Sequence, residues 1–331
     1  MEKYLHKCLD SLIIDDEGMK QLEVLVINDG SKDSSSQIAH GYQDKYPDTF
    51  RVIDKENGNY GSCINCGLKE ATGKYVKVLD ADDSFENKNV DSFLRLLSKA
   101  DTDMILSGVC TVNEQNAITG VTKRIINTDK VHKFGDLYNT LLTPFVQMHE
   151  VTYKRENLIK TNYRQEEGIS YTDQQWMHIP MLSVNTICFF NEIIYRYLVG
   201  REGQTVNMNV AAKSMPQKLK ITKILIETAN ENRGCDEYHF NYLKKRILEN
   251  AKENYKYVLC ISQNVLLLKQ LVEIDETLKL YFPKIWNELE TLTVPHTNFR
   301  YVHYWHGHKN LIGYPFLLII INKIFRIIHY L

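Results

Sequence analysis

The stretch VKVLDADDSF, residues 76–85, places three carboxylates directly after an apolar run. Residues 76–79 are typical of a buried strand, and Asp80, Asp82 and Asp83 follow where that strand should end. Three like charges so close together repel one another, so the cluster is tolerable either in open water or around a cation. Two interpretations are therefore open at this point: a solvated turn that caps the next helix, and a site for a divalent metal.

The residues on either side of this stretch alternate between helix and strand patterns. The rhythm predicts an α/β fold with parallel strands, and in such sheets ligands bind beyond the carboxyl ends of the strands. Both DADD and the segment NDGS at residues 28–31 lie at such ends. The expected elements are strands at residues 22–27, 50–53 and 75–79, and helices at residues 34–46 and 61–71.

The rest of the chain divides by pattern into two further parts. The alternating segments MILSGVCTV and TICFFNEIIYRYLV are expected to close the same sheet. After about residue 207 the apolar spacing becomes helical. We therefore predict a catalytic domain over residues 1–206, a helical extension over residues 207–292, and a basic, apolar tail over residues 293–331.

Composition narrows the functional classes. The 331 residues carry a formal net charge of -1, and no Lys/Arg block resembles a nucleic-acid-binding arm, so no nucleic-acid partner is expected. The seven cysteines form no regular framework, and the N-terminal MEKYLHKCLD lacks the apolar core of a signal peptide. Both features predict a cytoplasmic protein.

Several separate motifs then occur in a recognisable order. EVLVINDGSKDSS, ENGNYGSCINCGLKEATGKYVKVLDADD and GISYTDQQW together resemble the family-2 glycosyltransferases, especially bacterial surface-polysaccharide enzymes, over roughly residues 2–205. The resemblance implies an A-type glycosyltransferase fold, which is a single Rossmann-like nucleotide-binding domain with a mostly parallel central sheet. A helical extension would follow it.

The resemblance also assigns roles to the acidic cluster. Asp80 and Asp82 match the DxD element, with Asp80 nearer the nucleotide ribose and Asp82 on the metal, which would be Mn²⁺ or Mg²⁺. A cation between these carboxylates and a diphosphate stabilises the charge that develops on the leaving phosphate oxygen. Asp83 has no assigned role, and the alternatives are support behind the metal ligands or a helix cap.

The donor nucleotide is expected to bind at the first of these strand ends. Asp29 matches the family aspartate that contacts the base, Gly30 leaves room for a close backbone approach, and Asn57 lies in the matching Asn-Gly turn. A carboxylate can accept the imide N–H of uracil, so a UDP-sugar is the expected donor. The alternative for Asp29 is a plain Asx turn. Many relatives have Ala-Arg-Asn where this chain has CIN at residues 63–65, so no arginine is available there.

The acceptor side is predicted from GISYTDQQW and QMHEVTY. By resemblance Asp173 is the base that takes the proton from the acceptor hydroxyl, Trp176 offers an apolar face to a sugar ring, and His149 lines the acceptor site. The alternatives are an N-cap aspartate, a core tryptophan and a structural histidine.

A second phosphate contact is predicted in YLVGREGQTV. Arg201 and Thr205 match the basic and hydroxyl residues that relatives place over the diphosphate. Arginine offers forked donors to phosphate oxygens, and a glycine-flanked loop can close over a bound donor. The alternative is an ordinary surface turn.

The C-terminal tail has the pattern of a membrane-surface helix. Residues 291–331 contain no Asp or Glu, and the apolar run 311–321 falls short of the ~20 residues that span a bilayer. Lys309, Lys323 and Arg326 are expected to act as basic anchors, the alternative being a helix packed on the protein. For His303, His306 and His308 we expect no metal site, because no carboxylate is near them in the sequence.

The start of the chain departs from the family pattern. Relatives begin with a buried strand before a Glu-x-Tyr-Leu segment, whereas here Met1 is followed at once by Glu2, Tyr4 and Leu5. A misplaced start codon or a truncated gene is the expected explanation.

These inferences predict an inverting, metal-dependent glycosyltransferase that moves a sugar from a UDP-sugar to a cell-surface polysaccharide or lipid-linked glycan. It would lie on the inner face of the cell membrane as a peripheral protein. The alternatives are a nucleotidyltransferase of related fold, and an inactive, membrane-attached binding module.

Overall fold

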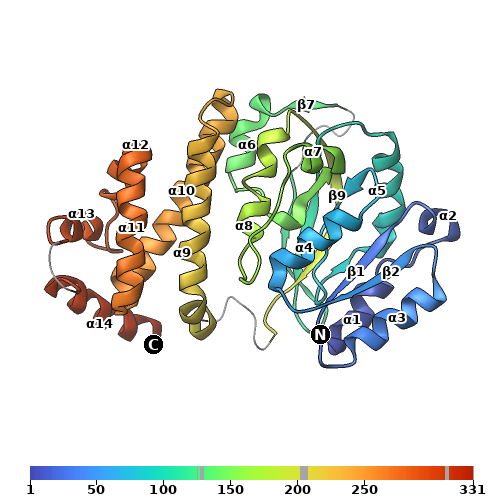
Figure 1. The fold of residues 1–331 in the computed structure, drawn as a ribbon, viewed down its shortest axis with the longest axis horizontal. Helices are drawn as coiled ribbons and strands as arrows, with labels where there is room; N and C mark the ends of the chain where they lie inside the picture. Colours follow the sequence, from blue (N-terminus) through green and yellow to red (C-terminus); the bar gives the residue numbers. More distant parts are fainter. Residues whose placement is uncertain (125, 127–129, 202–207, 310–312, 331) are drawn as a thin grey trace. The chain divides into compact units, whose positions relative to one another are not determined.

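The computed structural model describes residues 1–331 except 125, 127–129, 202–207, 310–312 and 331, and of residues 208–212 and 325–330 it describes the backbone alone. The chain forms two compact units, Met1–Gln204 and Thr205–Leu331 (Figure 1). The second unit therefore includes both the predicted helical extension and the tail.

Unit 1 contains a small parallel sheet of two strands. β1 (Val24–Asp29) pairs with β2 (Phe50–Lys55) in a register that sets Asp29 opposite Lys55. In the part of the chain that the structure describes, β1 pairs with β2 alone, and all six of its residues are only half-buried. Its carboxyl end carries NDGS, as predicted.

A larger, seven-stranded sheet forms the centre of unit 1. Its order is β3-β8-β5-β9-β4, with β6 on β5 and β7 on β9. Within it, the described residues contain one parallel pair, β5 with β9. The strands are β3 (Tyr75–Val76), β4 (Ser84–Phe85), β5 (Met104–Val112), β6 (Ile118–Thr122), β7 (His132–Lys133), β8 (Val151–Lys154) and β9 (Thr186–Leu198).

The predicted α/β class is confirmed, but the sheet is mixed rather than mostly parallel. One reason is visible at β5 and β6, which are joined by residues 113–117. Five residues are too few for the crossover that parallel neighbours need, so these strands run antiparallel. β3 also ends at Val76, three residues earlier than expected.

Helices cover both sheets of unit 1. The first of them, α1, buries Leu5, Cys8 and Leu9 and packs in one apolar cluster with Ala39 of α3 and Phe50 of β2. The helices are α1 (Glu2–Asp10), α2 (Asp16–Met19), α3 (Ser35–Lys45), α4 (Asn59–Glu70), α5 (Asn87–Lys99), α6 (Tyr138–Leu142), α7 (Arg155–Lys160) and α8 (Asp173–Trp176).

Unit 2 is helical, as its apolar spacing predicts. Two of its helices have side-chain caps: Asp236 accepts from the amides of Tyr238 and His239, and Asn264 accepts from those of Leu266 and Leu267. The helices are α9 (Met208–Glu231), α10 (Glu237–Lys256), a π-helical turn (Tyr257–Ile261), α11 (Val265–Tyr281), α12 (Pro283–Leu289), α13 (Tyr301–His306) and α14 (Phe316–Tyr330).

Two expectations about the tail are corrected. The apolar helix is α14 and begins after Pro315, whose fixed φ suits the start of a helix, so it covers residues 316–330 rather than 311–321. Lys309 pairs with Asp275 and Glu276 and is not a free anchor. No helix among the described residues is both long enough and apolar enough to cross a bilayer.

The histidines of the tail have carboxylate neighbours that the sequence did not indicate. His306 Nε2 lies 2.8 Å from Asp275 Oδ1, and its Nδ1 lies 2.8 Å from Glu290 Oε1. Asp275 also accepts from Tyr255 Oη at 2.6 Å and from Trp286 Nε1 at 3.1 Å. We call Tyr255, Asp275, Trp286, His306 and Lys309 the Asp275 cluster. It ties α13 and the following residues to α10, α11 and α12.

Candidate active site

The DADD segment forms a tight turn between β3 and β4. The amide of Asp83 donates to the carbonyl of Asp80 at 2.9 Å, which closes the turn and brings the carboxylates to one place. Tyr60 of α4 donates its hydroxyl to Asp80 Oδ1 at 3.0 Å. Burial raises the pKa of Asp80 to about 6, and the charges of Asp82 and Asp173 add to this effect. Asp80 therefore lies in a buried environment that contains other carboxylates.

Asp83 is the most deeply buried of the three acids, with 2% of its surface exposed. Its Oδ2 accepts from Tyr195 Oη at 2.7 Å, and its Oδ1 accepts from the amide of Leu198 at 2.7 Å. Burial nevertheless raises the pKa of Asp83 to about 8. Because both hydrogen bonds come from β9, Asp83 fixes the acidic turn to the end of that strand.

Asp82 has a different partner. Arg201 donates from Nε to Asp82 Oδ2 at 2.5 Å, and its guanidinium lies 5.8 Å from the ring centre of Tyr4. The two side chains of the ion pair are 19% and 11% exposed. The residue predicted to contact the diphosphate thus neutralises the residue predicted to bind the metal.

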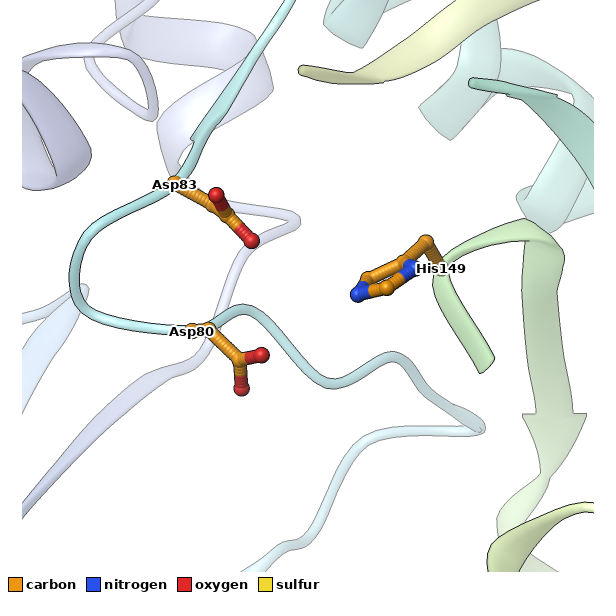
Figure 2. A group of neighbouring side chains, drawn as sticks. All are labelled: Asp80, Asp83 and His149. Carbon is orange, nitrogen blue, oxygen red and sulfur yellow. The ribbon is translucent and has the colours of Figure 1, made fainter. Parts of the chain in front are cut away.

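His149 faces the acidic turn from the opposite side. Its ring lies 4.6 Å from those of both Tyr195 and Tyr197, and it is stacked on the latter. Ligand atoms of Asp80, Asp83 and His149 all lie within 4.8 Å of one another (Figure 2). Burial lowers the pKa of His149 to about 4, so the imidazole is neutral near pH 7 and can act as a metal ligand.

A buried lysine supports the segment that carries His149. Lys77 Nζ donates to the carbonyls of His149 at 2.8 Å and Val151 at 3.2 Å. Burial lowers its pKa to about 7. These bonds connect residues just before the acidic turn to the residues that face it.

Asp29 and Lys55 form a pair at the carboxyl ends of β1 and β2. Lys55 Nζ lies 2.5 Å from Asp29 Oδ1 and also donates to Ser62 Oγ at 2.8 Å. The amide of Gly58 donates to the same Asp29 oxygen at 2.9 Å. Burial opposes ionisation of Asp29, but these hydrogen bonds outweigh it and lower its pKa. Asp29 is therefore a fixed, ionised acceptor at the start of α4.

Gly30 and Asn57 hold the two strand ends together. Gly30 has a φ of 71°, and a Cβ at this position would lie 3.2 Å from the amide nitrogen of Asn57. Asn57 Nδ2 donates to the carbonyl of Asp29 at 2.9 Å. A side chain at residue 30 would strain both the turn and this contact.

Asp173 begins α8 and lies near the acidic turn. Its charge acts on the pKa of Asp80 after burial and the nearer groups, and it has a similar effect on the buried Tyr60. Gln174 Nε2 donates to Asp173 Oδ2 at 3.0 Å. Asp173 is the first residue of the helix and Thr172 its N-cap, so the alternative of an N-cap aspartate is not what forms here.

Trp176 lies elsewhere than predicted. It is 1% exposed, and its ring packs edge-on against Tyr153 at 5.1 Å and Tyr163 at 5.6 Å. A ring enclosed in this way has no face for a sugar. The core tryptophan that the sequence left as an alternative is therefore the correct interpretation. Thr205, the predicted hydroxyl contact, lies outside the described residues.

Three residues of the site were missed at the sequence level. Lys55 was detectable in principle, because a parallel register places it opposite Asp29. Tyr60 stands in the predicted Asn-Gly loop, but nothing in the loop indicates a bond to Asp80. Tyr195 is one of several aromatic residues in a long strand, and only the fold selects it as the partner of Asp83.

The residues present fit a divalent cation. Three acids lie in one turn, and burial raises the pKa of both Asp80 and Asp83. Carboxylate oxygens are the ligands that Mn²⁺ and Mg²⁺ prefer, and a neutral imidazole faces them. The structure brings Asp80, Asp83 and His149 together to hold such an ion, whereas the predicted ligand Asp82 is paired with Arg201.

Comparisons with known proteins indicate a glycosyltransferase. Residues 1–161 match the model of glycosyl transferase family 2. Over 238 residues the chain is 28% identical to the uncharacterized glycosyltransferase YibD of Escherichia coli, covering 68% of this chain and 67% of that one. Over 165 residues it is 33% identical to the uncharacterized glycosyltransferase MG025 of Mycoplasma genitalium, covering 46% and 53%. The matches thus span about half to two thirds of these relatives.

Solved structures confirm the predicted A-type fold. TarS residues 1–349 of S. aureus, solved in complex with UDP-GlcNAc, superpose with a TM-score of 0.64 at 19% identity, covering 86% of this chain and 79% of that one. The same fragment has also been solved in complex with UDP. At this identity the likeness shows the fold, while the family model and the sequence relatives carry the classification. Residues 1–161 therefore match glycosyl transferase family 2.

Proposed function

We propose that this glycosyltransferase transfers a sugar from a UDP-sugar with inversion, using Mn²⁺ or Mg²⁺. The observation that carries the proposal is the acidic turn, in which Asp80 and Asp83 face His149 while Asp82 pairs with Arg201. A divalent cation between these carboxylates and a diphosphate would offset the negative charge of both. The cation stabilises the charge that develops on the leaving phosphate oxygen.

A uridine donor is supported by the Asp29 site. Lys55 and Gly58 hold the carboxylate ionised at the edge where ligands of such sheets bind. An ionised carboxylate accepts the imide N–H of uracil, whereas cytosine has no N–H at that ring position. TarS, of the same fold, binds UDP-GlcNAc, and we extend the nucleotide but not the sugar to this chain.

Asp173 is proposed as the base. It would accept the proton of the acceptor hydroxyl while that oxygen attacks the anomeric carbon opposite the leaving diphosphate. Its place near Asp80 and Tyr60 supports this role. Asp80 would bind the ribose, Gly30 and Asn57 would shape the base site, and Arg201 would turn to the diphosphate once a cation binds Asp82.

The test is release of UDP from UDP-sugars, with Mn²⁺ or Mg²⁺ and a glycan acceptor. Asp173→Asn should abolish transfer yet leave UDP affinity nearly intact, because the base acts on the acceptor alone. Loss of UDP affinity in this variant would assign Asp173 to the donor site or the fold. Release of inorganic diphosphate would instead indicate a nucleotidyltransferase, and UDP binding without turnover an inactive binding module.

The acceptor is proposed to be a cell-surface polysaccharide or a lipid-linked glycan. His149, which faces the acidic turn, would line the acceptor site. Residues 1–206 would carry the transfer, and the helical residues 207–331 would hold the enzyme at the inner face of the membrane. Adding lipid-linked acceptors in vesicles should raise turnover above that with soluble glycans. Equal turnover with both would contradict the membrane part of the proposal.

A further inference from the structure

Unit 2 exposes an apolar face that its fold does not cover. Six large apolar side chains lie between 39% and 70% exposed on two helices at one end of the unit. They are Val265 and Leu266 of α11, and Phe316, Leu317, Ile320 and Ile324 of α14. We call these six residues the α14 face. The other exposed large apolar residues of the described chain are spread over both units.

Specific contacts hold this face in place. Asn322 is 1% exposed, and its Nδ2 donates to the carbonyls of Cys260, Ile261 and Ser262 in and after the π-helical turn. Leu318, on the same side of α14, is fully buried. With this side fixed inward, residues 316, 320 and 324 point outward at spacings of four residues.

The two helices contribute to one surface. Tyr314 donates its hydroxyl to the carbonyls of Val258 at 2.9 Å and Asn264 at 3.2 Å. Phe316 and Leu266 each lie two residues beyond this contact. The start of α14 is thereby tied to the start of α11 (Figure 1).

The segments that form the α14 face carry exposed basic side chains. Lys256, Lys269 and Lys323 are exposed in the segments that form it. Residues 254–272 and 291–331 contain no Asp or Glu. An apolar surface with lysines in the same segments is complementary to anionic lipid, where apolar groups enter the acyl boundary and lysines meet the headgroups.

We propose that the α14 face docks unit 2 on an anionic membrane surface, with α14 parallel to the bilayer. This rests on and deepens the membrane attachment proposed above, and it requires none of the active-site residues. A second copy of the chain fits less well, because six such side chains cover on the order of 500 Å², less than the ~800 Å² per partner of a stable interface. The segments also offer no acid to pair with the lysines of another copy.

The test is sedimentation of the full-length protein with vesicles of phosphatidylglycerol and phosphatidylethanolamine, and with vesicles of phosphatidylcholine alone. The protein should bind the anionic vesicles and release from them as salt rises. The double substitution Phe316→Gln with Ile320→Gln should lower binding at least tenfold. Leu280→Gln is the matched control, because Leu280 is 71% exposed on α11 but lies outside the α14 face.

Substitution of the three lysines provides a second test of the same proposal. Lys256→Gln, Lys269→Gln and Lys323→Gln should each lower binding about fivefold, the equivalent of about 1 kcal/mol per basic residue. Circular dichroism of each variant checks that the exposed substitutions leave the fold unchanged. Equal binding to phosphatidylcholine, with no effect of the lysines, would refute the anionic surface.

Two outcomes would overturn the inference outright. One is full-length protein that ignores both kinds of vesicle. The other is a dimer in light scattering that Phe316→Gln with Ile320→Gln converts to a monomer, which would make a second copy the occupant. Because the assay contains no donor or acceptor, its failure is separable from failure of the proposed transfer.

Discussion

Asp83 in unit 1 and Asp275 in unit 2 are equally inaccessible but differ in protonation. Asp83 is 2% exposed and Asp275 is 0% exposed. Burial raises the pKa of Asp83 to about 8, whereas at Asp275 hydrogen bonds from His306, Lys309 and Tyr255 outweigh burial and lower the pKa to about 2. The difference lies in the neighbours, which are two other acids in the first case and two basic side chains in the second.

The two clusters therefore have different uses. In the Asp275 cluster the charge is satisfied within the protein, and the carboxylate connects four helical segments. In the DADD turn, by contrast, Asp80 and Asp83 accept from the neutral hydroxyls of Tyr60 and Tyr195, and Arg201 pairs with Asp82. A buried acid whose hydrogen-bond partners are neutral is a candidate ligand site. A buried acid paired with basic side chains, as in the Asp275 cluster, has a structural role instead.

The largest expected effect comes from disrupting the Asp275 cluster. Asp275→Asn leaves Lys309 and His306 without their buried counter-charge and should destabilise unit 2 by about 3–5 kcal/mol. Urea unfolding followed by fluorescence of Trp286 and Trp305 measures this loss. Glu276→Gln is the matched control, since Glu276 is 60% exposed and its pair with Lys309 should contribute within about 1 kcal/mol. Equal losses in both variants would contradict the distinction.

Low pH should also destabilise the Asp275 cluster. The pKa of Asp275 is lowered from 3.8 to about 2, so its ionised form stabilises the fold above about pH 4. This contribution, on the order of 2 kcal/mol, should disappear as the pH falls from about 4 through about 2. The unfolding free energy of unit 2, measured by the same fluorescence, should fall across this window. In Asp275→Asn that part of the slope should be absent.

A smaller effect is expected at the proposed metal site. Asp82→Asn nearly preserves volume but removes one charge from the proposed metal site, so Mn²⁺ affinity and sugar transfer should both fall at least tenfold. Calorimetric titration with Mn²⁺ measures the first quantity without needing an acceptor. Asp101→Asn, at a side chain 78% exposed, should change neither. An unchanged titration in Asp82→Asn would move the metal to other ligands.

The smallest effect concerns Arg201, the arginine that pairs with Asp82. Arg201 lies on Asp82 and must leave it when a metal binds, so Arg201→Gln should raise Mn²⁺ affinity about threefold in the absence of nucleotide. The same variant should bind UDP more weakly, because its phosphate contact is lost. Arg164→Gln is the control, since Arg164 is 73% exposed and pairs with Glu167 at the surface. Weaker Mn²⁺ binding in Arg201→Gln would show that the arginine assists the metal rather than competing with it.

Much of the fold was predictable because local patterns decide it. β1, β2, α3 and α4 lie within a few residues of the predicted bounds, and β5 and β9 follow their alternating segments. The acidic turn was predictable because its carboxylates are contiguous. Strand direction in the large sheet was not, since it depends on which strands meet and not on the composition of each.

Side-chain partners were the least predictable part of the site. Asp173 and Trp176 lie three residues apart, yet the Trp176 ring packs in the core while the charge of Asp173 acts on the pKa of Asp80. Lys309 reads as a free basic residue in a tail without acids, but its partner Asp275 lies 34 residues earlier. Such pairings require chain segments distant in sequence to meet.

The sequence by itself determined the α/β class, the resemblance to the family-2 glycosyltransferases, the helical nature of unit 2 and the cluster of acids after the third predicted strand. These properties follow from periodicity and from residues adjacent in the chain. Only the tertiary structure decided that Asp83 anchors to β9, that Arg201 covers Asp82, and that α14 turns one apolar face inward and leaves another exposed. The physical reason is that burial and charge pairing depend on packing between distant segments, and packing is a property of the folded chain.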